Sequence, residues 1–187
     1  SYGGADGGFI IVGYTDSPDL GQPQGGWDNY MFRINNMGIM QWDFRFGSTG
    51  TDKLAGVVES YTWGPGGADK HLAAIGNWLD GTNSSANVYD IWDKGNEADL
   101  VKYWDFTGED ATNFTSITRT GDGDHILAGY TNSNHRFMAG APLLSLSGCH
   151  GLNTSEPVVG GNDFWVLKFD NDLSCLLWET VTGGAEE

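Results

Sequence analysis

An internal repeat constrains the fold of this chain more than any other feature of its sequence. Three segments align without gaps: Ala5–Thr15 (ADGGFIIVGYT), Ala68–Trp78 (ADKHLAAIGNW) and Gly121–Thr131 (GDGDHILAGYT). Each has Asp at its second position, then an apolar run, then a Gly. Such self-similarity is typical of repeat architectures, in which each unit buries its apolar faces only against its neighbours.

Further apolar blocks follow each copy of this motif. A second block reads WDNYMFRIN from Trp27, ANVYDIWD from Ala86 and NDFWVLKFD from Asn162. A third block reads MQWDFRFG, VKYWDFTG and LLWETVTG, each with a Trp followed by an acid. A fourth block, LAGVVES or FTSITRT, follows Gly-rich turns in two of the repeats. Each repeat therefore contains about four apolar segments separated by turn residues.

The apolar residues in these blocks alternate with a period of two, which predicts β-strands. In MQWDFRF, Trp42, Phe44 and Phe46 share one face and the polar residues share the other. We expect an all-β, β-propeller-like fold with about three four-stranded antiparallel blades. The predicted repeats are approximately 1–51, 52–111 and 112–187, within one domain spanning 1–187.

The number of repeats is small for a closed ring. The sequence supplies about eleven strands, and the first of them corresponds to the second strand of a repeat. Three blades are fewer than the four to eight that usually close a propeller. We therefore expect further blades, from a larger parent chain or from self-assembly, because the terminal blades would otherwise be exposed edges.

The repeats resemble a propeller-type family found in many bacterial and archaeal surface or secreted proteins. That family's pattern has an Asp-Gly-Gly turn, a strand ending Ala-Gly-Tyr-Thr, a Gly-Gly-x-Asp-Phe-Trp strand and a closing Trp strand. The third repeat matches it at Asp122–Thr131, Gly160–Asp170 and Trp178–Gly184, and the first repeat matches at Asp6–Thr15, Gly25–Asn35 and Trp42–Gly47. The middle repeat departs at Trp78, Asn87 and Trp92. The resemblance implies a propeller fold and an extracellular or cell-surface location.

Charge and hydropathy exclude several classes of partner. The formal net charge is −16, from 25 acidic and 9 basic residues, so nucleic acid and anionic lipid are repelled. No apolar stretch approaches the length of a membrane helix. We expect protein or glycan partners, no nucleic-acid binding and no insertion into a membrane.

The loops between the second and third strands of each repeat are the expected binding face. We predict lengths of about 11 residues from Asp16, about 8 from Leu79 and about 30 from Asn132 to Gly161, and long loops concentrate function. Aromatic residues near these loops either stack on sugar rings or fill space between blades. The candidate binding residues on this face are Tyr14, Asp16, Trp78, Tyr130, His135 and His150.

No cofactor is expected, although two weaker alternatives concern metals. Asp122 and Asp124 form a two-acid turn that suits either backbone hydrogen bonding or calcium binding. The spacing of His135, Cys149 and His150 matches no zinc pattern.

Covalent features follow from single residues and short motifs. Cys149 and Cys175 are the two cysteines, and a disulfide between them requires the long loop to reach the opposite end of a strand. Asn83, Asn113 and Asn153 lie in N-x-S/T sequons, which favours a secreted glycoprotein if the source glycosylates such sites.

The sequence contains no recognised catalytic motif. There is no G-x-S-x-G, H-E-x-x-H or P-loop pattern. The leading interpretation is a non-catalytic extracellular or cell-surface module with a structural or protein-binding role. One alternative is a carbohydrate-binding propeller, and a second is a glycoside hydrolase-like enzyme that uses carboxylates in the central channel.

Overall fold

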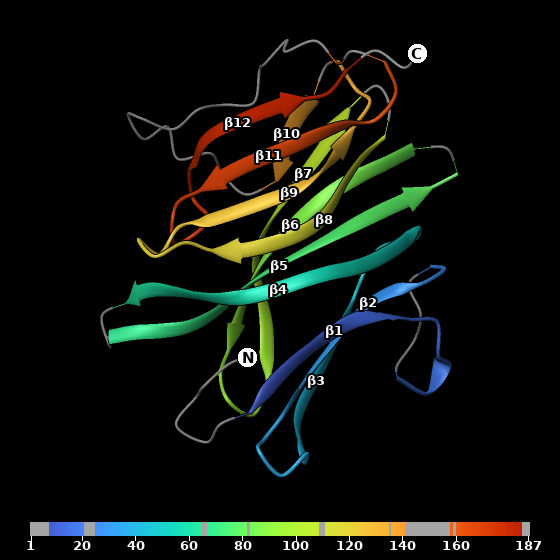
Figure 1. Ribbon diagram of the computed structural model, residues 1–187. Helices are drawn as coiled ribbons and strands as arrows, with labels where there is room; N and C mark the ends of the chain where they lie inside the picture. Colours follow the sequence, from blue (N-terminus) through green and yellow to red (C-terminus); the bar gives the residue numbers. More distant parts are fainter. Residues whose placement is uncertain are drawn as a thin grey trace.

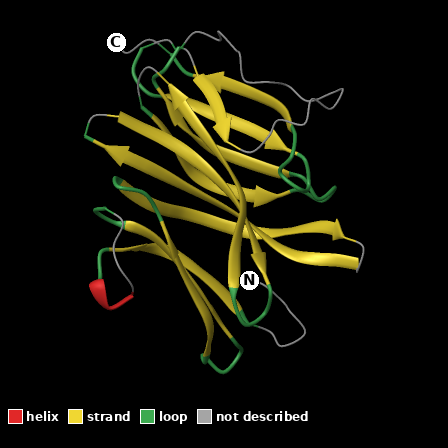
Figure 2. Ribbon diagram, turned by 180° about the vertical axis from the view of Figure 1, so that it is seen from behind, coloured by secondary structure: helices red, strands yellow, loops and turns green. Residues whose placement is uncertain are grey.

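The protein is built from three antiparallel β-sheets stacked one on the next (Figure 1). The computed structural model describes residues 8–20, 25–64, 67–81, 83–108, 111–134, 136–140, 158 and 160–184. Twelve strands lie in these segments, together with one short 3₁₀ helix, Pro18–Leu20 (Figure 2). The all-β prediction is confirmed, and none of the sheets is closed into a barrel.

The sheets follow one another along the chain. Sheet 1 contains β1 (Phe9–Thr15), β2 (Asp28–Ile34) and β3 (Met40–Phe46), in that order. Sheet 2 contains β4 (Thr51–Gly64), β5 (Gly67–Asp80), β6 (Asn83–Asp93) and β7 (Ala98–Gly108), with β10 (Arg136–Gly140) added at the edge of β7. Sheet 3 contains β8 (Thr112–Arg119), β9 (His125–Thr131), β11 (Asp163–Phe169) and β12 (Leu176–Thr182).

Each sheet is a meander whose strands come from one of the predicted repeats, apart from β10. Sheet 1 has three strands because none of the described strands pairs with the outer side of β1, where sheets 2 and 3 have β4 and β8. By position, β4 and β8 are therefore the first strands of their repeats, and β1 is a second strand.

Two predictions about the loops are wrong. The segment from Asn132 to Gly161 is not only a loop, because it contributes β10, which pairs with β7 of the preceding sheet. Sheet 2 consequently has five strands instead of four. The middle connection from Leu79 is not a long loop, because β5 and β6 extend until only residues 81 and 82 separate them. Strand length in the middle repeat takes up the residues that the sequence pattern suggested for a loop.

The glycine shared by the three repeats fits against a bulge in the first strand. A Cβ on Gly129 would lie 1.8 Å from the Asn113 carbonyl oxygen of β8. A Cβ on Gly76 would lie 3.0 Å from the Lys53 carbonyl oxygen of β4. The pairings shift register beside both glycines, as expected for bulges that bring backbone close. A Cβ on Gly13 would meet nothing within 4 Å, because none of the described strands lies at that edge of sheet 1.

Two apolar cores lie between the sheets, and sheet 2 contributes one face to each. The core between sheets 1 and 2 includes Met31, Trp42, Leu54, Leu72, Ala74, Tyr89 and Ile91. The core between sheets 2 and 3 includes Ala73, Ile75, Val88, Trp104, Phe106, Phe114, Leu127, Trp165, Leu167 and Phe169. Burying apolar side chains on both faces of sheet 2 is the main contribution that joins the sheets.

All three sheets have the same polarity in the stack. We call the face toward the following sheet the forward face and the opposite one the backward face. Aligned repeat positions occupy the same face in each sheet: Ile10 in sheet 1 and Ala73 in sheet 2 both face forward, into the cores named above. Ala74 in sheet 2 and Leu127 in sheet 3 are likewise equivalent, and both face backward. The sheets therefore pack head to tail, with each forward face against the next backward face.

Candidate functional site

A pocket of about 330 Å³ opens between sheets 1 and 2. It lies where β5 ends and where β2, β4 and β6 begin, on the side of the molecule that the sequence predicted to bind partners. Its lining residues are Asn29, Phe46, Gly47, Ser48, Asp52, Trp78, Ser85, Asn87, Tyr89, Leu100, Tyr103 and Asp105. A concave site with aromatic walls and a few polar groups is typical of small-molecule binding sites.

Two carboxyl groups line this pocket. Asp52 is buried at the start of β4, where one of its oxygens accepts hydrogen bonds from the Ser48 backbone N–H at 2.8 Å and hydroxyl at 2.9 Å. Asp105 lies in β7 and accepts a hydrogen bond from the Asn87 side chain at 3.2 Å. Burial is the main cause that raises the pKa of both carboxyl groups, and the hydrogen bonds partly oppose it. Perturbed carboxyl groups that share a pocket are characteristic of functional sites.

Two buried amide side chains also line the pocket. Asn87 uses its Nδ2 to donate to Asp105, and its Oδ1 has no hydrogen-bond partner in the described part of the chain. The Asn29 Nδ2 donates to the Tyr89 hydroxyl at 3.2 Å, and its Oδ1 also has no partner among the described residues. Burial raises the pKa of Tyr89 above its ordinary value. Buried polar atoms normally have partners, so these two oxygens are unusual.

An aromatic pair lies at the same end of the strands as the pocket. The Tyr14 and Trp27 rings meet edge to face, with centroids 5.2 Å apart. The Lys53 ammonium lies 4.5 Å from the centroid of the Tyr14 ring, a cation–π distance. This group ties the end of β1 to the start of β4.

The predicted binding residues lie in different places. Trp78 lines the pocket, and Tyr14 belongs to the neighbouring aromatic pair. Asp16 is exposed just beyond β1. Tyr130 lies on the forward face of sheet 3, away from the pocket. His135 and His150 lie outside the described residues.

The candidate calcium residues bind a lysine. The Lys168 ammonium contacts Asp122 at 3.2 Å and Asp124 at 2.8 Å. Asp122 also accepts a hydrogen bond from the Thr120 hydroxyl, which is the main cause that lowers its pKa. No group of three or more potential metal ligands occurs within the described segments.

The predicted covalent sites are only partly described. Cys175 precedes β12 and is not a free thiol, whereas Cys149 lies outside the described residues, so their pairing stays a prediction. Asn83 is the first residue of β6 and Asn113 lies in β8, so neither lies in a long loop. Asn153 lies outside the described residues.

Sequence reasoning missed most of the pocket, although a signal for it was present. The middle repeat departs from the shared pattern at Trp78 and Asn87, and both line the pocket. The third departure, Trp92, lies elsewhere, where Lys94 packs over its ring. Departures from a repeat that converge in space are therefore the signal that identifies the site.

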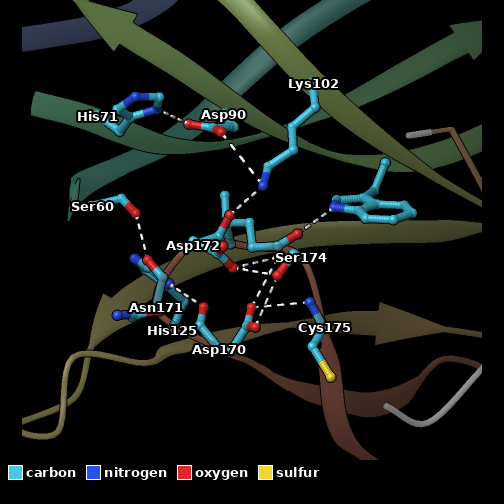
Figure 3. A network of polar contacts seen from close by, with 12 residues as sticks. Ser60, His71, Asp90, Lys102, His125, Asp170, Asn171, Asp172, Ser174 and Cys175 are labelled. Carbon is cyan, nitrogen blue, oxygen red and sulfur yellow. Dashed lines mark hydrogen bonds and ion pairs between the residues drawn. The ribbon is translucent and has the colours of Figure 1, made fainter. Parts of the chain in front are cut away.

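A turn of sheet 3 is held by polar side chains of sheet 2 (Figure 3). Ser60 donates to the Asn171 carbonyl oxygen at 2.7 Å, and Lys102 donates to the Asp172 carbonyl oxygen. Trp104 donates its indole N–H to the Leu173 carbonyl oxygen at 2.7 Å. Lys102 also lies 3.7 Å from Asp90, whose carboxylate accepts a hydrogen bond from the His71 ring at 2.6 Å. These bonds fix the register of sheet 3 on sheet 2.

The same kind of contact explains why a tryptophan recurs at this position of the repeats. In sheet 1, the Trp42 indole N–H donates at 3.0 Å to Asp93, which ends the third strand of sheet 2's repeat. Trp42 is 5% exposed and Trp104 is 2% exposed. Trp178, the equivalent residue of sheet 3, is 41% exposed. The difference follows from position, because no sheet lies in front of sheet 3 within the described chain.

Apolar side chains remain at both ends of the stack. The forward face of sheet 3 carries Tyr130, Phe164 and Trp178, which are 37%, 53% and 41% exposed. The backward face of sheet 1 carries Phe9, which is 50% exposed, and the partly buried Ile11 and Phe32. Apolar patches of this kind mark interaction surfaces.

Comparison with known proteins gives no family. No family model matches the chain, and no curated protein matches it. Within the described residues, no helix is long and apolar enough to span a membrane.

Proposed function

We propose that the protein is a non-catalytic β-propeller-type module with a structural, protein-binding role, and that its two end faces bind further sheets of the same kind. The observation that carries this proposal is the exposure of Trp178, whose equivalents Trp42 and Trp104 are buried by the sheet in front of them. A location outside the cell or on its surface is part of the proposal. It is supported by the resemblance of the repeats to surface and secreted proteins.

The two end faces are complementary because the sheets pack head to tail. The forward face of sheet 3 has the same repeat positions that sheets 1 and 2 use to receive a following sheet. The backward face of sheet 1 has the positions that sheets 2 and 3 use to receive a preceding one. Such heterologous faces generate a ring if the rotation closes and an open filament if it does not.

The open edge of β1 supports the same proposal. In sheets 2 and 3, the first strand covers the edge of the second and bulges beside the repeat glycine. In sheet 1 the equivalent space beside Gly13 is empty, because no described residue lies within 4 Å of the place that a Cβ would take. An added strand with a bulge beside Gly13 would complete a four-stranded blade. The unpaired backbone groups of an edge strand provide the hydrogen bonds for it.

Sedimentation equilibrium of the isolated chain tests the proposal. In a solution of this chain alone, only a second copy offers the complementary face, so we expect the mean mass to rise with concentration. Trp178→Ser should reduce this association, because it removes the largest apolar side chain of the forward face. Leu79→Ser is the matched control. The Leu79 side chain is 48% exposed, similar to that of Trp178, but it lies at the end of β5 in sheet 2 and not on either end face of the stack.

The proposal is contradicted if the folded chain stays monomeric at every concentration, or if Leu79→Ser reduces association as much as Trp178→Ser. Circular dichroism of both variants verifies that they fold. The carbohydrate-binding and hydrolase alternatives depend instead on the pocket between sheets 1 and 2, and the ligand experiment below tests them.

A further inference from the structure

The pocket between sheets 1 and 2 is lined by hydrogen-bond acceptors and ring faces. Its lining includes two carboxyl groups and two side-chain amides, and no Lys, Arg or His is among its lining residues in the described chain. The chain as a whole carries a formal net charge of −16. An anionic ligand is therefore disfavoured, and a ligand with positive charge gains from the field of the pocket.

Among the described residues, the carboxyl groups in the pocket have no cationic partner. Asp52 is bound by the neutral Ser48, and the one nearby charge that affects its pKa is the carboxylate of Asp28, which raises it. Asp105 is bound by the neutral Asn87. Neither forms an ion pair among the described residues. A partly buried carboxylate without a counter-charge is unfavourable unless a ligand supplies one.

The amide oxygens add a requirement for N–H or O–H donors. The Asn87 orientation is determined by its bond to Asp105, because only its Nδ2 can donate to a carboxylate. Its Oδ1 is therefore an acceptor, and it has no donor in the described part of the protein. Leaving a buried acceptor unpaired is unfavourable, so a bound donor is stabilised at this position.

The aromatic residues supply the remaining walls. Phe46 and Tyr89 meet edge to face with centroids 5.0 Å apart. Trp78 and the 48% exposed Tyr103 also line the pocket. The faces of such rings attract organic cations as well as apolar groups.

We propose that this pocket binds an organic ammonium group, with its N–H donors on the Asp105, Asp52 and Asn87 oxygens and its carbon skeleton against the aromatic walls. The inference does not depend on the proposed stacking of further sheets, because both walls of the pocket belong to this chain. The ligand class includes small primary amines and the lysine side chain of a partner protein, which share the same chemistry.

Titration with benzylammonium, followed through the indole N–H signal of Trp78 in NMR spectra, tests the proposal. Benzyl alcohol is the neutral control of the same shape, and methyl glucopyranoside is the neutral polyol. We expect benzylammonium to bind and the two neutral compounds to bind at least about tenfold more weakly, which corresponds to about 1.4 kcal/mol. Lowering the pH through the raised pKa of the carboxyl groups should weaken the binding of benzylammonium.

Variants separate the pocket from general surface charge. Asp105→Asn should weaken benzylammonium binding about tenfold or more, whereas Glu97→Gln should not. Glu97 carries the same charge but lies outside the pocket, with a side chain that is 60% exposed. A peptide with an N-acetylated lysine side chain, compared with its unmodified form, tests whether a partner's lysine is bound.

Four results would overturn the proposal. They are equal binding of benzyl alcohol, tighter binding of the pyranoside, equal loss in both variants, and the absence of any binding. Tighter binding of the pyranoside would assign the pocket to carbohydrate, and turnover of an aryl glycoside that Asp105→Asn abolishes would assign it to hydrolysis. Failure of this test leaves the sedimentation test of the end faces unaffected.

Discussion

The interface between sheets 2 and 3 is filled by aromatic rings, whereas the equivalent interface between sheets 1 and 2 contains a pocket. In the first, Trp165 is fully buried and stacks on Phe114, with centroids 5.0 Å apart and an interplanar angle of 12°. Phe106 meets the edge of the same cluster at 5.7 Å from Trp165. At the repeat position of Trp165, sheet 2 has the smaller Tyr89, which faces the pocket.

The polar residues differ between the two interfaces in the same way. The acid after the repeat tryptophan is Glu179 in sheet 3, where it pairs with the buried Arg136 at 3.3 Å. In sheet 2 the same position is Asp105, whose side-chain hydrogen-bond partners in the described chain, Asn87 and Ser85, are both neutral. At these positions, one scaffold therefore gives a filled interface with an ion-paired acid and an interface with a pocket whose acid has neutral partners. The two interfaces therefore differ through a few side chains at equivalent positions of the same repeat backbone.

The largest expected difference concerns the two tryptophans. Trp165→Ala should lower the free energy of unfolding by about 3–5 kcal/mol, because it leaves a cavity in the aromatic cluster. Trp78→Ala should lower it by about 1 kcal/mol or less, because Trp78 is half-buried at the wall of an existing pocket. Urea unfolding of both variants measures the difference. Similar losses in the two variants would show that the interfaces are equally packed.

The repeat glycine provides a second comparison. Gly129→Ala should destabilise the protein by about 3 kcal/mol, because its Cβ would meet the Asn113 carbonyl oxygen and backbone must move. Gly13→Ala should be neutral or stabilising by up to about 1 kcal/mol, since its Cβ meets nothing and Ala restricts the unfolded chain. Thermal unfolding checks both. A large loss in Gly13→Ala would mean that the edge of β1 is not open.

The all-β class and most of the strands were predictable, because they depend on local alternation and on the repeated glycine, tryptophan and acid, whereas the propeller arrangement stays a prediction. The order of the strands, apart from β10, follows from short connections between neighbouring segments. The strand β10 was not predictable, because its residues lie in a segment without period-two alternation and are positioned by pairing with β7. The same holds for the pocket, because Asp52 of β4 and Asp105 of β7 line one pocket only after the strands of sheet 2 have paired and sheet 1 has packed against them.

The smallest expected effect is that of pH on the free energy of unfolding through Asp105, the acid that has no ion-pair partner among the described residues. Burial raises the pKa of Asp105 above its ordinary value of 3.8, so the folded state binds the proton more tightly than the unfolded state does. The free energy of unfolding therefore falls as the pH rises from 3.8 through the raised pKa. Asp105→Asn should remove this slope and stabilise the protein at neutral pH by on the order of 0.5 kcal/mol, a value reduced because the group is partly exposed.

The paired acid provides the control for that measurement. Glu179→Gln should destabilise the protein at neutral pH, because it weakens the bonds to Arg136 and to the Trp165 indole. Chemical unfolding of both variants between pH 3.5 and pH 7 gives the two profiles. Stabilisation by Glu179→Gln, or a steeper dependence of the free energy of unfolding on pH in Asp105→Asn, would contradict the conclusion that Glu179 is ion-paired and Asp105 is not.

Hydrogen exchange at the tryptophan indole N–H groups tests the head-to-tail relation of the sheets most directly. In the dilute chain, Trp42 and Trp104 should exchange slowly, because their N–H groups bond to the sheet in front of them, while Trp178 exchanges quickly. On assembly at high concentration, Trp178 alone should become protected. Unchanged exchange of Trp178 in the assembled state, or rapid exchange of Trp42 and Trp104 in the dilute chain, would contradict the account.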